Sequence, residues 1–331
     1  MKGFLERMLR SYAPLVVGLL LFLLFWGGRL GGFSGEPLPE SSLSIFGLSV
    51  PLSPLAGGIV SMVLYAISAY LLSRIIGEYQ LYNTRTHFPT GLFLGLVAAS
   101  SFLIPFPSGG LCLVLVLFML YVLMSTYQRR DAVGEYVIGF SLFSLASIFF
   151  PKWLLFVPVL LVGGNMLQSL TPRTFMAAVI GLIVPYWIGA GVLFMFDKLS
   201  LFVVPFEELI RFDAIVYSGL TLRELAAAFM LLFLAIPGFV LFPSTLFSIK
   251  EKARVCYQFM LLMAVAVLLF MLLQPTLFSG LFPVLAGIAC LFVTQMLISS
   301  KSRMGGVYLL LLVVFFVAYC TLPLWEASVP F

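Results

Sequence analysis

The stretch of this chain best equipped for chemistry is a short charged segment between two apolar runs, at residues 197–224. Arginine side chains in such a segment can bind a carboxylate or phosphate through paired hydrogen bonds. Solvated loop charge is the simpler interpretation of this segment, and a site for a lipid headgroup or a sugar is the alternative. The charged candidates are Glu207, Glu208, Arg211, Asp213, Arg223 and Glu224.

Two amide side chains within apolar runs form the second candidate set, Gln295 and Asn165. An amide in an apolar surrounding needs a hydrogen-bond partner, which a neighbouring helix or a substrate can supply. Contact between helices is the commoner role. Gln295 is expected to lie nearest the membrane interior, where its amide needs such a partner.

The chain offers little for catalysis or for metal binding. It has one histidine, His87, and its four cysteines all fall within apolar runs. Zinc and iron enzymes draw on several histidine or cysteine ligands at fixed spacing, and that spacing is missing here. No phosphate-binding glycine loop and no serine nucleophile motif occurs. We predict no catalytic residue, no metal site and no cofactor.

The composition excludes a water-soluble globule. Hydrophobic residues make up 62% of the chain and charged residues only 9%, whereas a soluble domain has about 25% charged residues. The net charge of +5 is not gathered into a basic patch with interleaved aromatics, so we expect no nucleic-acid partner. The sequence predicts one integral membrane domain over residues 1–331, with membrane lipids around it.

Apolar runs of about 17 residues or more can cross a hydrocarbon core as helices. The sequence predicts an all-α bundle of about eleven such spans. The third, fifth and sixth runs are short enough to be tilted or interrupted. The predicted spans are 12–30, 55–76, 88–104, 109–127, 134–150, 153–170, 174–196, 225–247, 255–273, 277–298 and 305–322.

The basic residues predict which way this bundle faces. With eleven spans, 13 of the 18 Lys and Arg residues fall on the side of the N-terminus, and loops rich in Lys and Arg face the cytoplasm. We therefore expect the N-terminus inside and the C-terminus outside. Trp26, Trp153 and Trp325 fall at predicted outer ends, where indole rings typically sit at the membrane surface.

Two outer connections are long, at residues 31–54 and 197–224. The second contains residues 206–213, whose apolar spacing favours a short helix lying on the membrane surface. Thr221 and Glu224 have the spacing of a capping box, which predicts a helix start.

Three features within the predicted spans concern helix packing. Gly91 and Gly95 form a GxxxG motif that permits close helix approach. Pro185 and Pro237 interrupt two spans on either side of the second outer loop. Broken helices often line cavities, since their freed backbone groups need polar company.

Three short motifs carry a resemblance to a known family: NTRTHFP at 83–89, LTPRTF at 170–175, and GLIVPY at 181–186 running on to Asp197. Together they resemble an uncharacterised family of polytopic inner-membrane proteins from Bacteroidota. Some members carry a carotene-monooxygenase label, which conflicts with the single histidine here, because carotenoid-cleaving enzymes hold iron with four. The resemblance implies a Gram-negative inner membrane and assigns no functional residue.

The leading hypothesis is a non-enzymatic inner-membrane protein of envelope biogenesis, which acts as a subunit or handles lipid-linked material. Membrane lipids and other inner-membrane proteins are the expected partners. A secondary transporter or flippase is the alternative, and a membrane-embedded glycosyl or lipid transferase is the third. A lateral cleft beside Arg211 and Arg223 would favour lipid handling, whereas a central cavity at Gln295 or Asn165 would favour transport.

Overall fold

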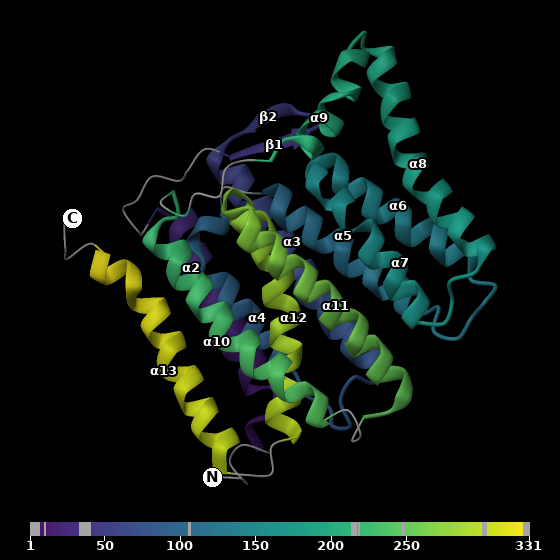
Figure 1. Cartoon of the computed structure of the whole chain (residues 1–331). Coiled ribbons are helices and arrows are strands. Elements are labelled where there is room, and N and C mark those ends of the chain that lie inside the picture. Colours follow the sequence, from purple (N-terminus) through teal and green to yellow (C-terminus); the bar gives the residue numbers. More distant parts are fainter. Residues whose placement is uncertain are drawn as a thin grey trace.

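The protein is a bundle of long helices with a small two-stranded hairpin at one end, as the computed structural model shows (Figure 1). The structure describes residues 7–9, 11–32, 41–104, 107–212, 217, 219–245, 249–299 and 303–326. Its α-helices are α2 (Ala13–Leu30), α3 (Pro54–Glu78), α4 (Phe88–Ala99), α5 (Pro107–Met124), α6 (Val133–Phe149), α7 (Val157–Met166), α8 (Pro172–Met195), α9 (Val204–Ile210), α10 (Leu222–Thr245), α11 (Glu251–Leu273), α12 (Phe278–Ser299) and α13 (Arg303–Glu326).

Each predicted apolar run contains one α-helix, so the helical part of the prediction is confirmed. Within the described residues, six helices are long and apolar enough to cross a membrane: α2, α3, α8, α10, α11 and α12. The other apolar helices contribute described apolar stretches of 10–17 residues. Two of the runs expected to be interrupted are divided, because a 3-10 turn η1 (Ser101–Leu103) follows α4 and a longer one, η2 (Pro151–Phe156), precedes α7.

Helix α12 is the centre of the bundle. Of its most apolar stretch 94% is buried inside the protein, against 17% for α2 and for α8. It packs against α4, α5, α10 and α11. The surrounding helices bury one face and leave apolar side chains on the other, as expected of helices surrounded by lipid rather than water.

Small residues allow the closest helix contacts. A Cβ at Gly91 of α4 would overlap the backbone carbonyl of Pro14 in α2, and one at Gly95 would meet the Phe316 ring of α13. The GxxxG motif therefore serves packing, as the sequence predicts. Close backbone approach is the main source of helix association in lipid, where no hydrophobic force draws helices together.

The predicted all-α fold lacks the β-hairpin that the structure shows. Strands β1 (Ser41–Ile45) and β2 (Leu48–Leu52) pair antiparallel through Phe46 and Gly47. Both turn residues have positive φ, 50° and 75°, which a two-residue hairpin turn of this kind requires. The alternation of leucine, isoleucine and valine with serine around Phe-Gly is the sequence signal for it.

The tryptophans correct a second expectation. Trp26 and Trp153 are fully buried rather than placed at a membrane surface. The indole N–H of Trp26 donates to the Val97 carbonyl at 3.2 Å, and the Trp153 ring packs between Phe143 and Phe156. The side chain of Trp325 lies outside the described residues.

In two proline-interrupted helices, hydroxyl groups of neighbouring helices donate to the carbonyls that proline leaves unpaired. Pro185 has no N–H to give the carbonyl of Gly181, four residues earlier, and Ser141 of α6 donates to that oxygen at 3.0 Å. Pro237 likewise frees the carbonyl of Phe233, which accepts from the Tyr308 hydroxyl of α13 at 3.1 Å. Neighbouring helices thus satisfy these breaks.

We expect Ser141→Ala to lower the thermal stability of the purified protein in mild detergent, by about 1 kcal/mol, because it leaves the Gly181 carbonyl without a partner. Adding Pro185→Ala restores the helical N–H and should make the same serine change nearly neutral. Ser68→Ala is the matched control, since Ser68 donates to the Leu64 carbonyl within its own helix. Equal losses of stability for Ser141→Ala alone, for Ser141→Ala in the Pro185→Ala background and for Ser68→Ala would contradict this account.

Candidate functional site

An apolar groove lies at the hairpin end of the bundle, between α8 and the segment that follows it. The groove has a volume of about 660 Å³. Its walls are α8, η2, the 3-10 turn η3 (Leu199–Phe202) and α9. The lining residues are Leu154, Leu182, Ile183, Tyr186, Trp187, Ala190, Gly191, Phe194, Leu199, Phe202 and Phe206.

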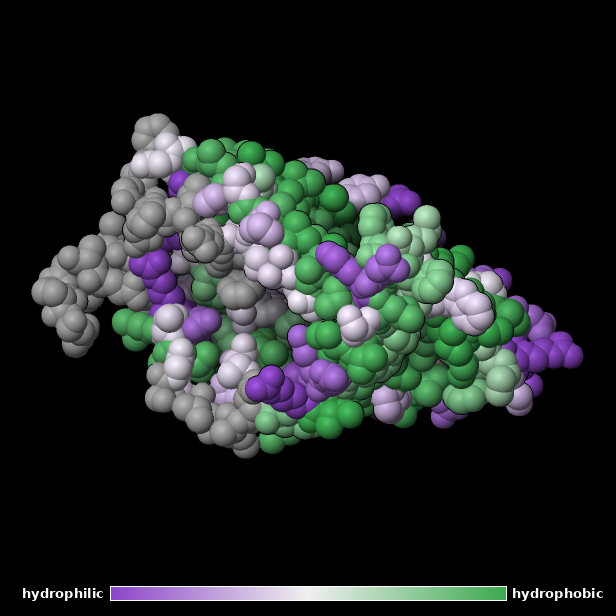
Figure 2. Space-filling view, turned by 90° about the horizontal axis from the view of Figure 1, so that it is seen from above, coloured by the Kyte–Doolittle hydropathy of each residue, from purple (hydrophilic) through white to green (hydrophobic). Residues whose placement is uncertain are grey.

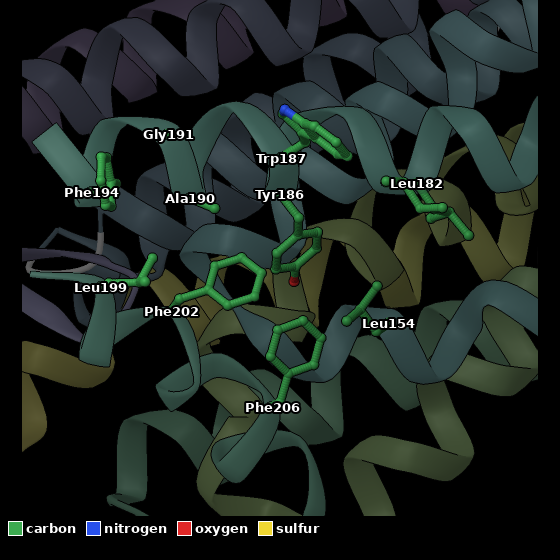
Figure 3. Close-up of a pocket in the computed structure, with 11 residues that line it drawn as sticks. Leu154, Leu182, Tyr186, Trp187, Ala190, Gly191, Phe194, Leu199, Phe202 and Phe206 are labelled. Atoms are coloured by element: carbon green, nitrogen blue, oxygen red, sulfur yellow. The ribbon is translucent and has the colours of Figure 1, made fainter.

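Three aromatic rings form the floor of this groove, and they converge from three elements (Figure 3). The ring of Tyr186 lies 6.3 Å from that of Phe202 and 5.2 Å from that of Phe206, centroid to centroid. Phe202 and Phe206 are 5.6 Å apart. Spacings of this size are those of attractive aromatic pairs, so the floor is rigid and apolar.

The hairpin and α6 hold the floor in place. The Tyr186 hydroxyl shares a 2.9 Å hydrogen bond with Ser147 of α6, which turns its polar atom away from the groove. Phe46, in the hairpin turn, is buried against Tyr186 and Phe202. A Cβ at Gly189 of α8 would overlap the Phe46 ring, so the missing side chain allows that ring its position.

The rim of the groove is open to the surroundings of the bundle. Trp187 is 76% exposed and Phe194 is 70% exposed. Beyond Tyr186 no residue of α8 is buried, and this part of the helix rises past its neighbours (Figure 1). Viewed from the hairpin end, polar side chains gather in separate patches among hydrophobic surface (Figure 2). Such an open apolar groove suits a hydrocarbon chain better than a polar solute.

A buried lysine fastens α9 beside the groove. Lys152 of η2 is 8% exposed, and its ammonium donates to the Arg211 carbonyl at 2.9 Å. The same nitrogen lies 5.5 Å from the centre of the Phe212 ring. A cation at the last carbonyls of a helix also meets the negative end of its dipole. Lys152 therefore joins the end of α9 to η2.

The charged candidates of residues 197–224 lie in different surroundings. Glu207, Glu208 and Arg211 are exposed on α9 or just after it, close to the groove, since α9 packs on η2 and η3. Asp213 lies outside the described residues. The helix predicted at 206–213 is present as α9, at Val204–Ile210.

Arg223 belongs to another part of the hairpin end. It lies in the first turn of α10, which packs on α12, α13 and η1, and its guanidinium donates to the Ser101 hydroxyl at 3.3 Å. The capping box predicted beside it is confirmed, because the Glu224 carboxylate accepts from the Thr221 backbone N–H at 2.9 Å. Arg211 therefore follows the helix that forms one wall of the groove, without lining the groove itself, whereas Arg223 belongs to other helices.

The two amide candidates line neither the groove nor the cavity described below. Gln295 is 4% exposed, and its amide donates to the Ser299 hydroxyl, one turn later in α12, at 3.0 Å. Asn165 is exposed in the last turn of α7. Gln295 is thus a core residue with a partner in its own helix.

Sequence reasoning missed the groove and Lys152. The groove residues are ordinary apolar side chains, and only the departure of α8 from the bundle makes a cavity of them. In the sequence, Lys152 is indistinguishable from other basic residues in short loops. The single available signal was the lysine between Pro151 and Trp153, in a segment where a positive charge goes against the orientation rule.

Comparisons with models of protein families, with curated proteins and with solved structures find no match for this chain. The resemblance to the Bacteroidota family therefore stays a prediction.

We expect Lys152→Met to release the segment after α9, because it removes the donor to the Arg211 carbonyl while keeping most of the side-chain volume. Trypsin cleaves the peptide bond that contains this carbonyl. Cleavage after Arg211 in the folded protein should become several times faster. The exposed Lys198 supplies the control, Lys198→Met, which should leave that rate unchanged. A rate equal to the unmodified protein's in Lys152→Met would show that the contact does not hold the segment.

Proposed function

We propose that this protein is a bacterial inner-membrane protein that crosses the bilayer eleven times, with its N-terminus in the cytoplasm and its hairpin end outside. Six helices of sufficient length and apolarity support this, as does the gathering of Lys and Arg at the other end. The shorter helices α4 and α7 reach further when η1 and η2 are added to them.

Within that frame, the function we propose is to bind a lipid chain in the groove at the outer leaflet and so to handle lipid or lipid-linked material without catalysis. The observation that carries the proposal is the aromatic groove between α8 and α9, open at Trp187 and Phe194. Its volume falls within the range of about 300–1,000 Å³ typical of small-molecule sites.

The physical basis of this binding differs from that of a soluble lipid carrier. A chain that moves from the bilayer into the groove exchanges one apolar surrounding for another, so the hydrophobic effect contributes little. Selectivity must then come from packing against the rings of Tyr186, Phe202 and Phe206, and from the headgroup. The exposed Glu207, Glu208 and Arg211 on the adjoining helix are the groups that a headgroup would meet.

Occupancy of the groove can be tested by filling it. A Cβ at Gly191 meets open space, so we expect Gly191→Trp to fold and to exclude a chain. In nanodiscs whose phospholipid carries a photoreactive group in its acyl chain, crosslinks to residues 186–206 should fall severalfold.

Gly27→Trp is the matched control, because Gly27 also has open space around it and lies on α2, away from the groove. It should leave crosslinks to residues 186–206 unchanged. If the unmodified protein showed no more crosslinking there than along α2, the groove would be no binding site and the proposal would fail.

A further inference from the structure

A second cavity lies at the end of the bundle opposite the hairpin. It has a volume of about 630 Å³ and is bounded by the last turns of α3, the segment that joins α3 to α4, and the starts of α2 and α11. Unlike the groove, it is lined largely by polar side chains. Its lining residues are Tyr12, Ser73, Ile76, Gly77, Gln80, Tyr82, Asn83, Thr84, Arg85, Thr86, His87 and Lys250.

The charge in this cavity has one sign. Arg85 and Lys250 are positively charged, His87 adds an imidazole, and none of the described lining residues is acidic. The side chains come from two connections, because Arg85 and His87 precede α4 while Lys250 precedes α11. Lys250 donates to the Gln80 side-chain oxygen, and His87 stacks on the Tyr12 ring with centroids 4.7 Å apart. These contacts hold the cavity's walls in position.

Three helices also begin at this cavity. Tyr12, His87 and Lys250 are the residues at the N-terminal caps of α2, α4 and α11, and all three line it. The N-terminus of a helix carries about half a positive charge from its aligned peptide dipoles. The caps of α4 and α11 are basic rather than the usual Ser, Thr, Asp or Asn. The dipoles and the side chains therefore add to the same positive field.

The nearest acidic residues in the sequence lie outside the lining. Glu251, the first residue of α11, lies close to Tyr127, where burial and this carboxylate both raise the pKa of the hydroxyl. Glu78, at the end of α3, is exposed and lies beside Tyr79. The described lining of the cavity thus carries positive charge without an acidic partner among its own residues.

We propose that this cavity binds a phosphate-bearing anion. Arg85 forms the paired hydrogen bonds that suit a phosphate, and Lys250 adds a point charge. The phosphate comes either from a lipid headgroup or from a soluble phosphate compound. The motif Asn83–His87, which carries the family resemblance, then has a chemical role. This site is separate from the groove and does not depend on the function proposed for it.

The test compares two double variants that remove the same charge from neighbouring positions. Arg85→Gln with Lys250→Gln empties the cavity of its charged groups. Arg74→Gln with Lys252→Gln removes the charges of one exposed side chain of α3 and one of α11. Neither side chain lines the cavity. Binding is measured on the full-length protein in neutral detergent. The probes are inorganic pyrophosphate at constant ionic strength and phosphatidylglycerol, with a phosphate-free glycolipid as reference.

We expect at least one phosphate probe to bind the unmodified protein, and the Arg85/Lys250 variant to weaken that binding by about tenfold or more, since each lost contact is a charge-assisted hydrogen bond. The Arg74/Lys252 variant should change it less than twofold. Binding of pyrophosphate identifies a soluble ligand, and binding of phosphatidylglycerol alone identifies a headgroup.

Three results would overturn the proposal: no binding of either phosphate probe, equal weakening in both variants, or equal binding of the glycolipid. Each double variant also loses one contact, from Lys250 to Gln80 or from Lys252 to the Tyr79 ring, so the melting temperatures of the two variants without anion should fall by similar, small amounts. If the double variant fails to fold, Arg85→Gln alone must show the loss of affinity.

Discussion

The need to pair every backbone polar group inside the protein shapes this structure more than any other constraint. A helix meets it internally, which is why apolar runs become helices in lipid. At Pro185 and Pro237, which remove a donor, the neighbouring helix supplies a hydroxyl, from Ser141 to the Gly181 carbonyl and from Tyr308 to the Phe233 carbonyl. The same constraint applies near Trp26, whose indole N–H donates to the Val97 backbone carbonyl. These polar side chains of the bundle therefore act as hydrogen-bond partners of its backbone.

The groove follows from where this packing stops. The first half of α8 lies against α6, with Ser141, Ser144 and Ser147 all bonded across the contact. Past Tyr186 the helix leaves the bundle, and most of its large apolar side chains are exposed. Lys152 and the hairpin then bring η3 and α9 back over that helix. A cavity made in this way is apolar on every side and open to lipid, which is why we connect it with hydrocarbon chains.

The sequence predicts what depends on local pattern and misses what depends on tertiary contact. Helical runs, the capping box at Thr221, the GxxxG contact and the short helix near residue 206 are all local, and each is present. The hairpin turn at Phe46 also has a local signal, although residues 31–54 are interpreted from the sequence as a connection without regular structure. Burial of Trp26 and Trp153, the groove, and the meeting of Arg85 with Lys250 depend on segments far apart in the chain. Residue types alone group Arg211 with Arg223, whereas the fold places the two residues beside different elements.

The central claim is that the groove and the cationic cavity lie on opposite sides of one membrane, which requires the helices between them to cross it an odd number of times. Reporter fusions placed after Phe212 and after Lys252 test this directly, because α10 is the one helix that the structure describes between these positions. Alkaline phosphatase, which is active only outside the cytoplasm, should be active after Phe212 and inactive after Lys252. Activity at both positions, or at neither, would contradict the account.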